Sequence, residues 1–316
     1  MGTVLTKDSR ILIVGHNDSL ERSLAAHFRS QGQTQVFSSS AMGVDVTNQK
    51  IAEDFFAQHK PEYVFLSSTR SGGIMANQQN PGEFIYHNLA SAMNILFLAN
   101  KCRVKKLVFL ASSCVYPAQC RQPIQEKALL TGPLEASNEP YSVAKIAGIK
   151  LCQAFRQQYG LNAIVMVPAT LYGPGEVADL EKSHVLGALI HKFYQAVKTG
   201  QNEVSVWGSG RPRREFLYID DFIQAVLYLL DEYNGGDIIN AGTGKDVTIK
   251  DLATMVARIS GFKGRIVFDR SKPDGTMRKL LDSRCINMLG WKAKVSLEEG
   301  IRQTYEWYRQ SHAINA

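Results

Sequence analysis

Short apolar runs alternate with longer helical stretches over the first 170 residues, and this rhythm limits the possible folds more than any other feature. The predicted strands span residues 10–14, 35–38, 62–67, 106–111 and 163–167. The predicted helices span residues 19–31, 48–59, 82–101 and 140–159. Strands that are apolar throughout and separated by helices are typical of a parallel sheet covered on both faces. The pattern therefore predicts an α/β fold with a doubly wound, Rossmann-like parallel sheet, whose ligands bind at the carboxyl ends of the strands.

The rhythm changes after the segment PATLYGPGE, residues 168–176, which contains two prolines and two glycines beyond the last predicted strand. Such punctuation marks a break between structural units. Predicted helices then span 184–199, 221–232, 248–260 and 296–312, with short strands at 203–207, 214–218, 237–240 and 265–268. We expect a dinucleotide-binding domain over residues 1–170 and a smaller mixed α/β substrate lobe over 171–316. Some segments of the second part are expected to return to the first.

Composition and charge favour a folded chain that acts on small molecules. Hydrophobic residues make up 45% of the 316-residue sequence, yet no apolar run approaches the roughly 20 residues of a membrane span. The segment MGTVLTKDSR lacks the apolar stretch of a signal peptide, so we expect a cytoplasmic protein with no membrane partner. The formal net charge of +7 is dispersed, which suits an anionic small substrate better than nucleic acid. The five cysteines are odd in number and form no C-x-x-C pair, so we expect reduced thiols and no cysteine-based metal site.

A serine, a tyrosine and a lysine form the first candidate catalytic set. Tyr141 and Lys145 are four positions apart in a predicted helix, so they share one face. An ammonium group beside a phenol favours the phenolate, so Lys145 should lower the pKa of Tyr141. Ser112 follows a predicted strand and can steady a substrate oxygen, so the three together can protonate a ketone while a hydride reaches its carbon. The alternative is a surface tyrosine beside a solvated lysine.

A thiol and an imidazole form the second candidate set. Cys114 lies two residues after Ser112, and His184 opens the predicted helix 184–199. Protons beside a ketone are acidic because the carbanion is an enolate, and a base on one face with an acid on the other inverts the carbon. The spacing by itself leaves open two structural roles, a buried inert cysteine and a helix-capping histidine.

The turn after the first predicted strand departs from a dinucleotide-binding loop. Gly15 is present, but Asp18 and Glu21 occupy the places where a G-x-x-G-x-x-G pattern has its other two glycines. The middle glycine of such a loop lets the backbone approach a pyrophosphate. Asp18 and Glu21 also read as a D-x-x-E capping box, whose carboxylates satisfy the helix N–H groups that otherwise hold phosphate. We expect these two residues to compete with a cofactor.

Longer motifs extend these observations over nearly the whole chain. They are SSCVYP, NEPYSVAKIAGIKLC, LYGPG, SHVLGALI, VWGSGRPRREFLYIDD, NAGTGKDVTIKDLA and SKPDGTMRKLLD. Through them the sequence resembles the GDP-L-fucose synthases, which are bifunctional GDP-4-keto-6-deoxymannose 3,5-epimerase/4-reductases of the extended short-chain dehydrogenase/reductase superfamily. The resemblance implies conversion of a GDP-4-keto-6-deoxy sugar to a GDP-L-fucose-type product, use of NADPH, and a homodimer in which helices near 82–101 and 140–159 pack together. A related 4-keto sugar such as a heptose is equally compatible with these residues.

The resemblance also assigns site residues. The reduction triad falls on Ser112, Tyr141 and Lys145, the epimerisation base on Cys114 and the acid on His184. The residues implied for the GDP-sugar are Val185, Leu189, Lys192, Trp207, Arg214 and Lys279. The residues implied for the cofactor are Gly15, Asn17, Asp45, Val46, Tyr141 and Lys145. Lys192 stands where the family usually has arginine, so a bidentate phosphate contact would become a point charge.

The cofactor site differs from the family at several further positions. The family's arginines would fall at Asn17 and Ala41, and no Arg or Lys stands between Gln31 and Gln49. No acidic residue stands at the end of the second predicted strand either, so an NAD-type ribose contact is not predicted. SSTRSGG, residues 67–73, replaces the family's AAAKVGG beside the nicotinamide ribose. Three hypotheses follow: an epimerase–reductase, an epimerase with weakened or lost NADPH binding, and a non-catalytic partner subunit.

Overall fold

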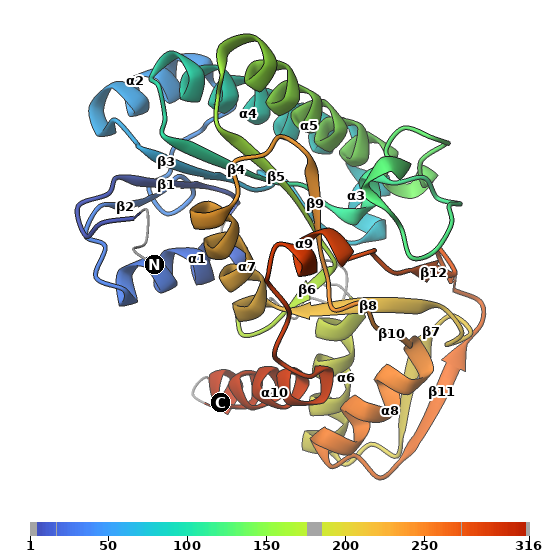
Figure 1. Cartoon of the computed structure of the whole chain (residues 1–316). Coiled ribbons are helices and arrows are strands. Elements are labelled where there is room, and N and C mark those ends of the chain that lie inside the picture. Colours follow the sequence, from blue (N-terminus) through green and yellow to red (C-terminus); the bar gives the residue numbers. More distant parts are fainter. Residues whose placement is uncertain (1–4, 17, 176–184, 273, 314–316) are drawn as a thin grey trace.

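A six-stranded parallel sheet forms the larger part of the molecule (Figure 1). The computed structural model describes residues 5–16, 18–175, 185–272 and 274–313. The strand order is β2–β1–β3–β4–β5–β9, and every neighbouring pair is parallel. The strand bounds are β1 Ile11–Val14, β2 Val36–Ser38, β3 Tyr63–Leu66, β4 Lys106–Leu110, β5 Ala163–Pro168 and β9 Ile238–Ala241. The predicted α/β fold with a doubly wound, Rossmann-like parallel sheet is confirmed.

Helices cover both faces of this sheet. Figure 1 shows α2, α4 and α5 on one face and α1 and α7 on the other. The helix bounds in this part are α1 Ser19–Ser30, α2 Gln49–His59, α3 Ile74–Gln79, α4 Pro81–Lys101, α5 Glu139–Tyr159, α7 Ile219–Glu232 and α9 Arg284–Met288. Strand residues such as Leu12, Phe65 and Phe109 are buried between the two helical layers. Burial on both faces is the physical reason that these strands are apolar throughout.

The ends of the helices follow from local residues. Asp18 accepts a hydrogen bond from the backbone N–H of Glu21 and so caps α1. Pro140 stands in the first turn of α5, where an N–H has no partner within the helix, and Gly160 ends the helix with a φ of 73°. This start places Tyr141 in the first turn of α5.

A second, smaller part of the molecule has its own strands and hydrophobic core. β8 is flanked by β10 and β12 and also pairs with β6, while β7 pairs with β11. The bounds are β6 Thr170–Tyr172, β7 Glu203–Trp207, β8 Arg213–Tyr218, β10 Asp246–Thr248, β11 Arg265–Asp269, β12 Arg278–Lys279, α6 Val185–Thr199, α8 Ile249–Ser260 and α10 Leu297–Ala313. Phe193, Leu252 and Ile301 are buried in the core that these elements enclose.

Some segments that follow residue 170 in the chain pack with the larger sheet. Phe222 of α7, Ile239 of β9 and Ile286 of α9 lie in the larger hydrophobic core. The division into residues 1–170 and 171–316 stays a prediction. At the level of elements, every predicted strand and helix is present, and the structure adds the short elements β6, β10, β12, α3 and α9.

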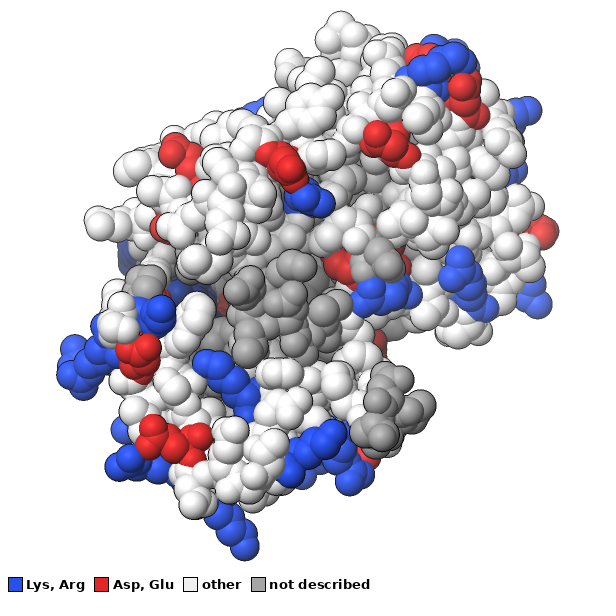
Figure 2. Space-filling model, turned by 180° about the vertical axis from the view of Figure 1, so that it is seen from behind, with Lys and Arg blue, Asp and Glu red and all other residues white. Residues whose placement is uncertain are grey.

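Charge is dispersed over the surface. On the face drawn in Figure 2, lysine and arginine side chains are interspersed with acidic ones. Among the described residues, no helix combines the length and apolar character needed to cross a membrane. The same residues contain no group of three or more His, Cys, Asp and Glu side chains that could hold a metal ion.

Candidate active site

The end of β4 and the start of α5 bring four of the predicted site residues together. Beyond β4, Ser112 caps a short 3-10 helix, Ser113–Val115, by accepting a hydrogen bond from the backbone N–H of Cys114 at 3.5 Å. Tyr141 and Lys145 lie one turn apart on α5. Lys145 Nζ donates to the carbonyl of Leu110 at 2.8 Å and lies 5.9 Å from the centre of the Tyr141 ring. The helix–strand packing thus collects Ser112, Cys114, Tyr141 and Lys145 at the carboxyl edge of the sheet.

The Tyr141 hydroxyl has two serine neighbours. Its oxygen lies 2.7 Å from Ser68 Oγ, and a hydrogen bond with Ser112 favours its ionised form. Burial nevertheless raises the pKa of Tyr141, and the nearby Cys114 acts in the same direction. The expected lowering of the pKa of Tyr141 is therefore wrong for the structure, in which desolvation of the buried phenol is the largest cause and raises it. A phenol with a raised pKa stays protonated at neutral pH.

Burial also changes Lys145. Desolvation lowers the pKa of its ammonium to about 8, and Cys114 opposes this shift. The Lys145 side chain is buried, with its Nζ 4.9 Å from the centre of the Phe109 ring. An amine with a pKa near neutrality changes its charge within the working range of most enzymes.

Cys114 lies where the reduction set meets a cationic region. Its side chain is 5% exposed and carries a free thiol. It is close enough to affect the pKa values of Tyr141, Lys145 and Lys279. The other member of the predicted pair, His184, lies outside the described residues.

Two cationic residues, Arg214 of β8 and Lys279 of β12, face this region from neighbouring strands. In the parallel pairing of β8 with β12, Arg213 is opposite Arg278 and Arg214 is opposite Lys279. Arg213 and Arg278 both bind Asp246, at 2.7 and 2.5 Å. Side chains alternate along a strand, so Arg214 and Lys279 occupy the other face.

This second pair is partly buried. Desolvation lowers the pKa values of both Arg214 and Lys279. Among the described residues, neither forms an ion pair with a carboxylate. Two buried, adjacent cations repel each other, so a bound dianion would be favoured there.

The other predicted sugar-nucleotide residues lie on α6 and β7. Lys192 Nζ donates to the Ser205 carbonyl at 2.8 Å and lies 5.6 Å from the Trp207 ring centre. Trp207 is 50% exposed, and Lys272 lies 5.4 Å from its ring centre. Val185 is half-buried at the start of α6, whereas Leu189 is packed in the smaller core and offers little side-chain surface to a ligand. Trp207 is therefore the accessible aromatic face of this group.

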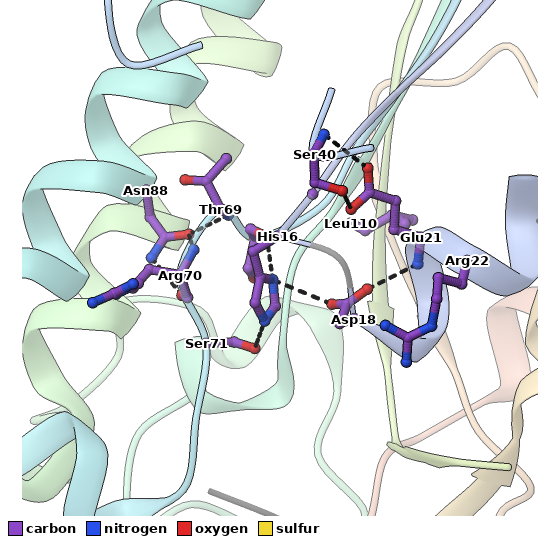
Figure 3. Close-up of polar contacts among 12 residues, drawn as sticks. His16, Asp18, Glu21, Arg22, Ser40, Thr69, Arg70, Ser71, Asn88 and Leu110 are labelled. Carbon is purple, nitrogen blue, oxygen red and sulfur yellow. Dashed lines mark hydrogen bonds and ion pairs between the residues drawn. The ribbon is translucent and has the colours of Figure 1, made fainter. Parts of the chain in front are cut away.

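The loop after β1 has an unexpected arrangement, shown in Figure 3. Asp18 Oδ1 accepts a hydrogen bond from the Glu21 N–H at 2.8 Å, and Asp18 Oδ2 lies 3.5 Å from His16 Nδ1. The Glu21 carboxylate turns inward instead, toward Ser38 and Ser40. Of the predicted capping box, the bond that Asp18 accepts is therefore present, while the Glu21 carboxylate oxygens bind Ser38 and Ser40.

Close packing explains why Gly15 is a glycine. A Cβ at this position would lie 2.7 Å from Glu21 Oε2. The Gly15 N–H donates to Ser39 Oγ at 3.4 Å. Asn17, the next residue implied for the cofactor, lies outside the described residues.

The residues implied for adenine lie beyond β2. Asp45 Oδ1 accepts hydrogen bonds from the Thr47 N–H and hydroxyl at 3.0 and 2.6 Å, and the Thr47 hydroxyl bond lowers the pKa of Asp45. The Val46 carbonyl accepts from Asn94 Nδ2 at 3.0 Å. Asp45 and Val46 are thus held by contacts within the chain, and their role toward adenine stays a prediction.

Sequence reasoning missed two features of this site. The first is the contact of Ser68 with the Tyr141 hydroxyl. The sequence sign that could have indicated it is a serine in SSTRSGG at a position where the resemblance predicts alanine. Glu21 reaches the end of β2, and no local pattern could have shown it, because β1–β2 pairing brings Ser38 and Ser40 to the helix.

Several known proteins are similar to nearly the whole length of this chain. The sequence model of the NAD dependent epimerase/dehydratase family matches residues 11–242. "Probable GDP-L-fucose synthase 1" of Oryza sativa subsp. japonica is 47% identical, over 98% of this chain and 97% of its own length. A solved GDP-6-OMe-4-keto-L-xylo-heptose reductase from C. jejuni is 34% identical with a TM-score of 0.90, over 98% of this chain and all of that one. MlghC, a GDP-mannoheptose C4 reductase from Campylobacter jejuni solved with NADP bound, is 35% identical with a TM-score of 0.87, over 96% of this chain and 99% of that one.

Proposed function

This chain belongs to the NAD dependent epimerase/dehydratase family, and from that premise we propose that it has the activity of a GDP-L-fucose synthase. It inverts C3 and C5 of a GDP-4-keto-6-deoxy sugar and reduces the C4 ketone with NADPH. One observation carries the proposal: the similarity to a GDP-L-fucose synthase extends over 98% of the chain, in which Ser112, Cys114, Tyr141 and Lys145 lie together at one sheet edge.

The reduction uses the hydroxyl cluster. The nicotinamide, when bound, supplies the hydride to C4. Tyr141 donates its proton to the C4 oxygen, and Ser112 hydrogen-bonds the same oxygen. The hydrogen bond between Tyr141 and Ser68 supports this role, because it can stabilise the phenolate that is left after the proton is transferred.

The epimerisation uses a thiol base and an imidazole acid. Cys114 as thiolate removes the proton from the carbon beside the ketone, and the electron pair enters the enolate. His184 then donates a proton to the opposite face of that carbon. The position of Cys114 beside Tyr141 and Lys279 supports this role, since the sugar ketone and the diphosphate would meet there.

The nucleotide diphosphate binds the cationic residues of the smaller part. Arg214 and Lys279 take its phosphates, Lys192 adds a point charge, and Trp207 offers a flat face to the base. Val185 and Leu189 shape the start of α6 against the ligand. Gly15, Asn17, Asp45 and Val46 hold the adenine half of the cofactor, and Tyr141 and Lys145 hold the nicotinamide half.

The two alternative functions are less well supported. The Asp18 cap at the start of α1 is the one observation that favours an epimerase without hydride transfer. The comparisons do not favour it, because the C. jejuni relatives are named as reductases and one has NADP bound. A non-catalytic subunit would not need the buried Ser112–Cys114–Tyr141–Lys145 set.

We also infer a homodimer in the cytoplasm. Tyr86, Met93 and Phe97 of α4 and Val143 of α5 are exposed, and α4 and α5 pack side by side. An apolar surface of this kind is typical of a subunit interface. The five free thiols suit a reducing compartment.

Incubation with GDP-4-keto-6-deoxymannose in deuterated water, with and without NADPH, tests the proposal. We expect deuterium at C3 and C5 without NADPH, and one NADPH oxidised per sugar when it is present. Exchange with no NADPH oxidation would leave the epimerase alternative, and neither event would leave the subunit alternative.

A further inference from the structure

We propose that Glu21 sets the cofactor preference, because its carboxylate lies at the carboxyl end of β2 and disfavours the 2′-phosphate of NADPH there. The chain then binds NADH about as tightly as NADPH. This inference rests on the proposed reductase function and concerns the adenosine half of the cofactor.

The position of the carboxylate is defined by several hydrogen bonds. Glu21 Oε1 accepts from Ser38 Oγ at 2.6 Å. Glu21 Oε1 also accepts from the Ser40 N–H at 3.4 Å, and Oε2 accepts from Ser40 Oγ at 2.7 Å (Figure 3). Both carboxylate oxygens therefore accept hydrogen bonds from the last residue of β2 or from the loop that follows it. The side chain is 1% exposed, so its charge is shielded from solvent.

This place in the fold is where dinucleotide-binding sheets distinguish the two cofactors. Ser38 is the last residue of β2, and Ser40 follows it. In such sheets an acidic residue there accepts a hydrogen bond from the ribose 2′-hydroxyl of NAD, whereas an arginine accommodates the 2′-phosphate of NADP. The sequence has no acid at that point of the strand, but Glu21 reaches it from α1.

The same region lacks the opposite charge. No Arg or Lys occurs between Gln31 and Gln49, so β2 and the loop after it provide no cation to a 2′-phosphate. The buried Glu21 carboxylate would repel a phosphate dianion placed at the end of β2, whereas an uncharged 2′-hydroxyl would feel no such repulsion. Glu21 is therefore a specificity-determining residue, distinct from Asp18, which lies at the pyrophosphate turn.

Direct binding measurements on the full chain test this inference. The dissociation constants of NADH and NADPH would be measured without sugar, by nicotinamide fluorescence or calorimetry, for the wild type, Glu21→Gln and Asp54→Asn. Glu21→Gln keeps the shape of the side chain and removes its charge. Asp54→Asn removes one charge from the exposed part of α2 and serves as the matched control.

We expect the wild type to bind the two cofactors with constants within about threefold of each other, and Glu21→Gln to shift the ratio toward NADPH by about tenfold. Asp54→Asn should leave the ratio unchanged. A wild type that prefers NADPH by more than tenfold, a ratio that Glu21→Gln does not change, or no binding of either cofactor would overturn the inference. A wild-type preference for NADPH overturns the inference even if the variant fails to fold.

The proposed function is tested separately. Deuterium exchange at C3 and C5 needs no added NADPH, so its loss would contradict the proposed epimerisation without bearing on Glu21. A shifted cofactor ratio in a chain without exchange would support the role of Glu21 in cofactor choice alone.

Discussion

Tyr141 lies near the hydroxyls of Ser68 and Ser112. Ser112 is part of the family's reduction triad, whereas Ser68 stands where the family has alanine. Its hydrogen bond can stabilise the phenolate left after proton transfer. We expect Ser68→Ala to slow NADPH oxidation about tenfold, the value of one lost hydrogen bond to a charged group. Exchange at C3 and C5 should not change. Ser68→Thr should restore the rate, Ser113→Ala should be silent, and equal losses of reduction and exchange in Ser68→Ala would contradict a role at Tyr141.

Lys145 gives the reduction a dependence on pH. Its pKa is lowered to about 8, so its ammonium is present below that pH and lost above it. The ammonium stabilises the phenolate formed when Tyr141 gives up its proton. We therefore expect the rate of NADPH oxidation to fall as pH rises through about 8. In Lys145→Arg the side chain keeps its charge over this range, so the rate should not fall there. A wild-type rate that is constant from pH 7 to 9.5 would contradict the assignment.

At the scale of the element, the start of α1 combines stability with a cost to cofactor binding. Asp18 caps the helix at the place where the family has a glycine. We expect Asp18→Gly to tighten NADH and NADPH binding alike by removing a negative charge from the pyrophosphate turn. The same change should lower the free energy of unfolding by only about 0.3 kcal/mol, because glycine is itself a tolerated N-cap residue. Calorimetry and urea unfolding would measure the two effects, and unchanged affinity would show that the cap does not compete with the cofactor.

The long elements were predictable and the short ones were not. β1, β3 and β4 are apolar throughout because helices cover both of their faces, and that signal is local. β12 has two residues and α9 has five, which is too short for a periodic pattern. Within the site, the sequence predicted that Tyr141 and Lys145 share one face, because both lie on the same helix. The pairing of Arg214 with Lys279 depends on the β8–β12 register, and the inward turn of Glu21 depends on β1–β2 pairing.

At the scale of the whole molecule, the apolar surface of α4 gives the proposed dimer a test. Tyr86, Met93 and Phe97 repeat at spacings of seven and four, so they form one stripe on the helix. We expect Met93→Asp to convert the dimer to a monomer in light scattering after gel filtration. Met288→Asp, at an exposed position on α9, should leave the dimer intact. A wild-type monomer, or a Met93→Asp dimer, would contradict the proposed interface.

Two substitutions compared in deuterated water test most directly whether Cys114 acts in the epimerisation and Tyr141 in the reduction. Cys114→Ser and Tyr141→Phe would each be incubated with GDP-4-keto-6-deoxymannose, with deuterium at C3 and C5 and NADPH oxidation followed together. Cys114→Ser should lose exchange while binding the GDP-sugar within about tenfold of the wild type. Tyr141→Phe should keep exchange and lose NADPH oxidation. Full exchange in Cys114→Ser would contradict the assignment of the thiol as the base.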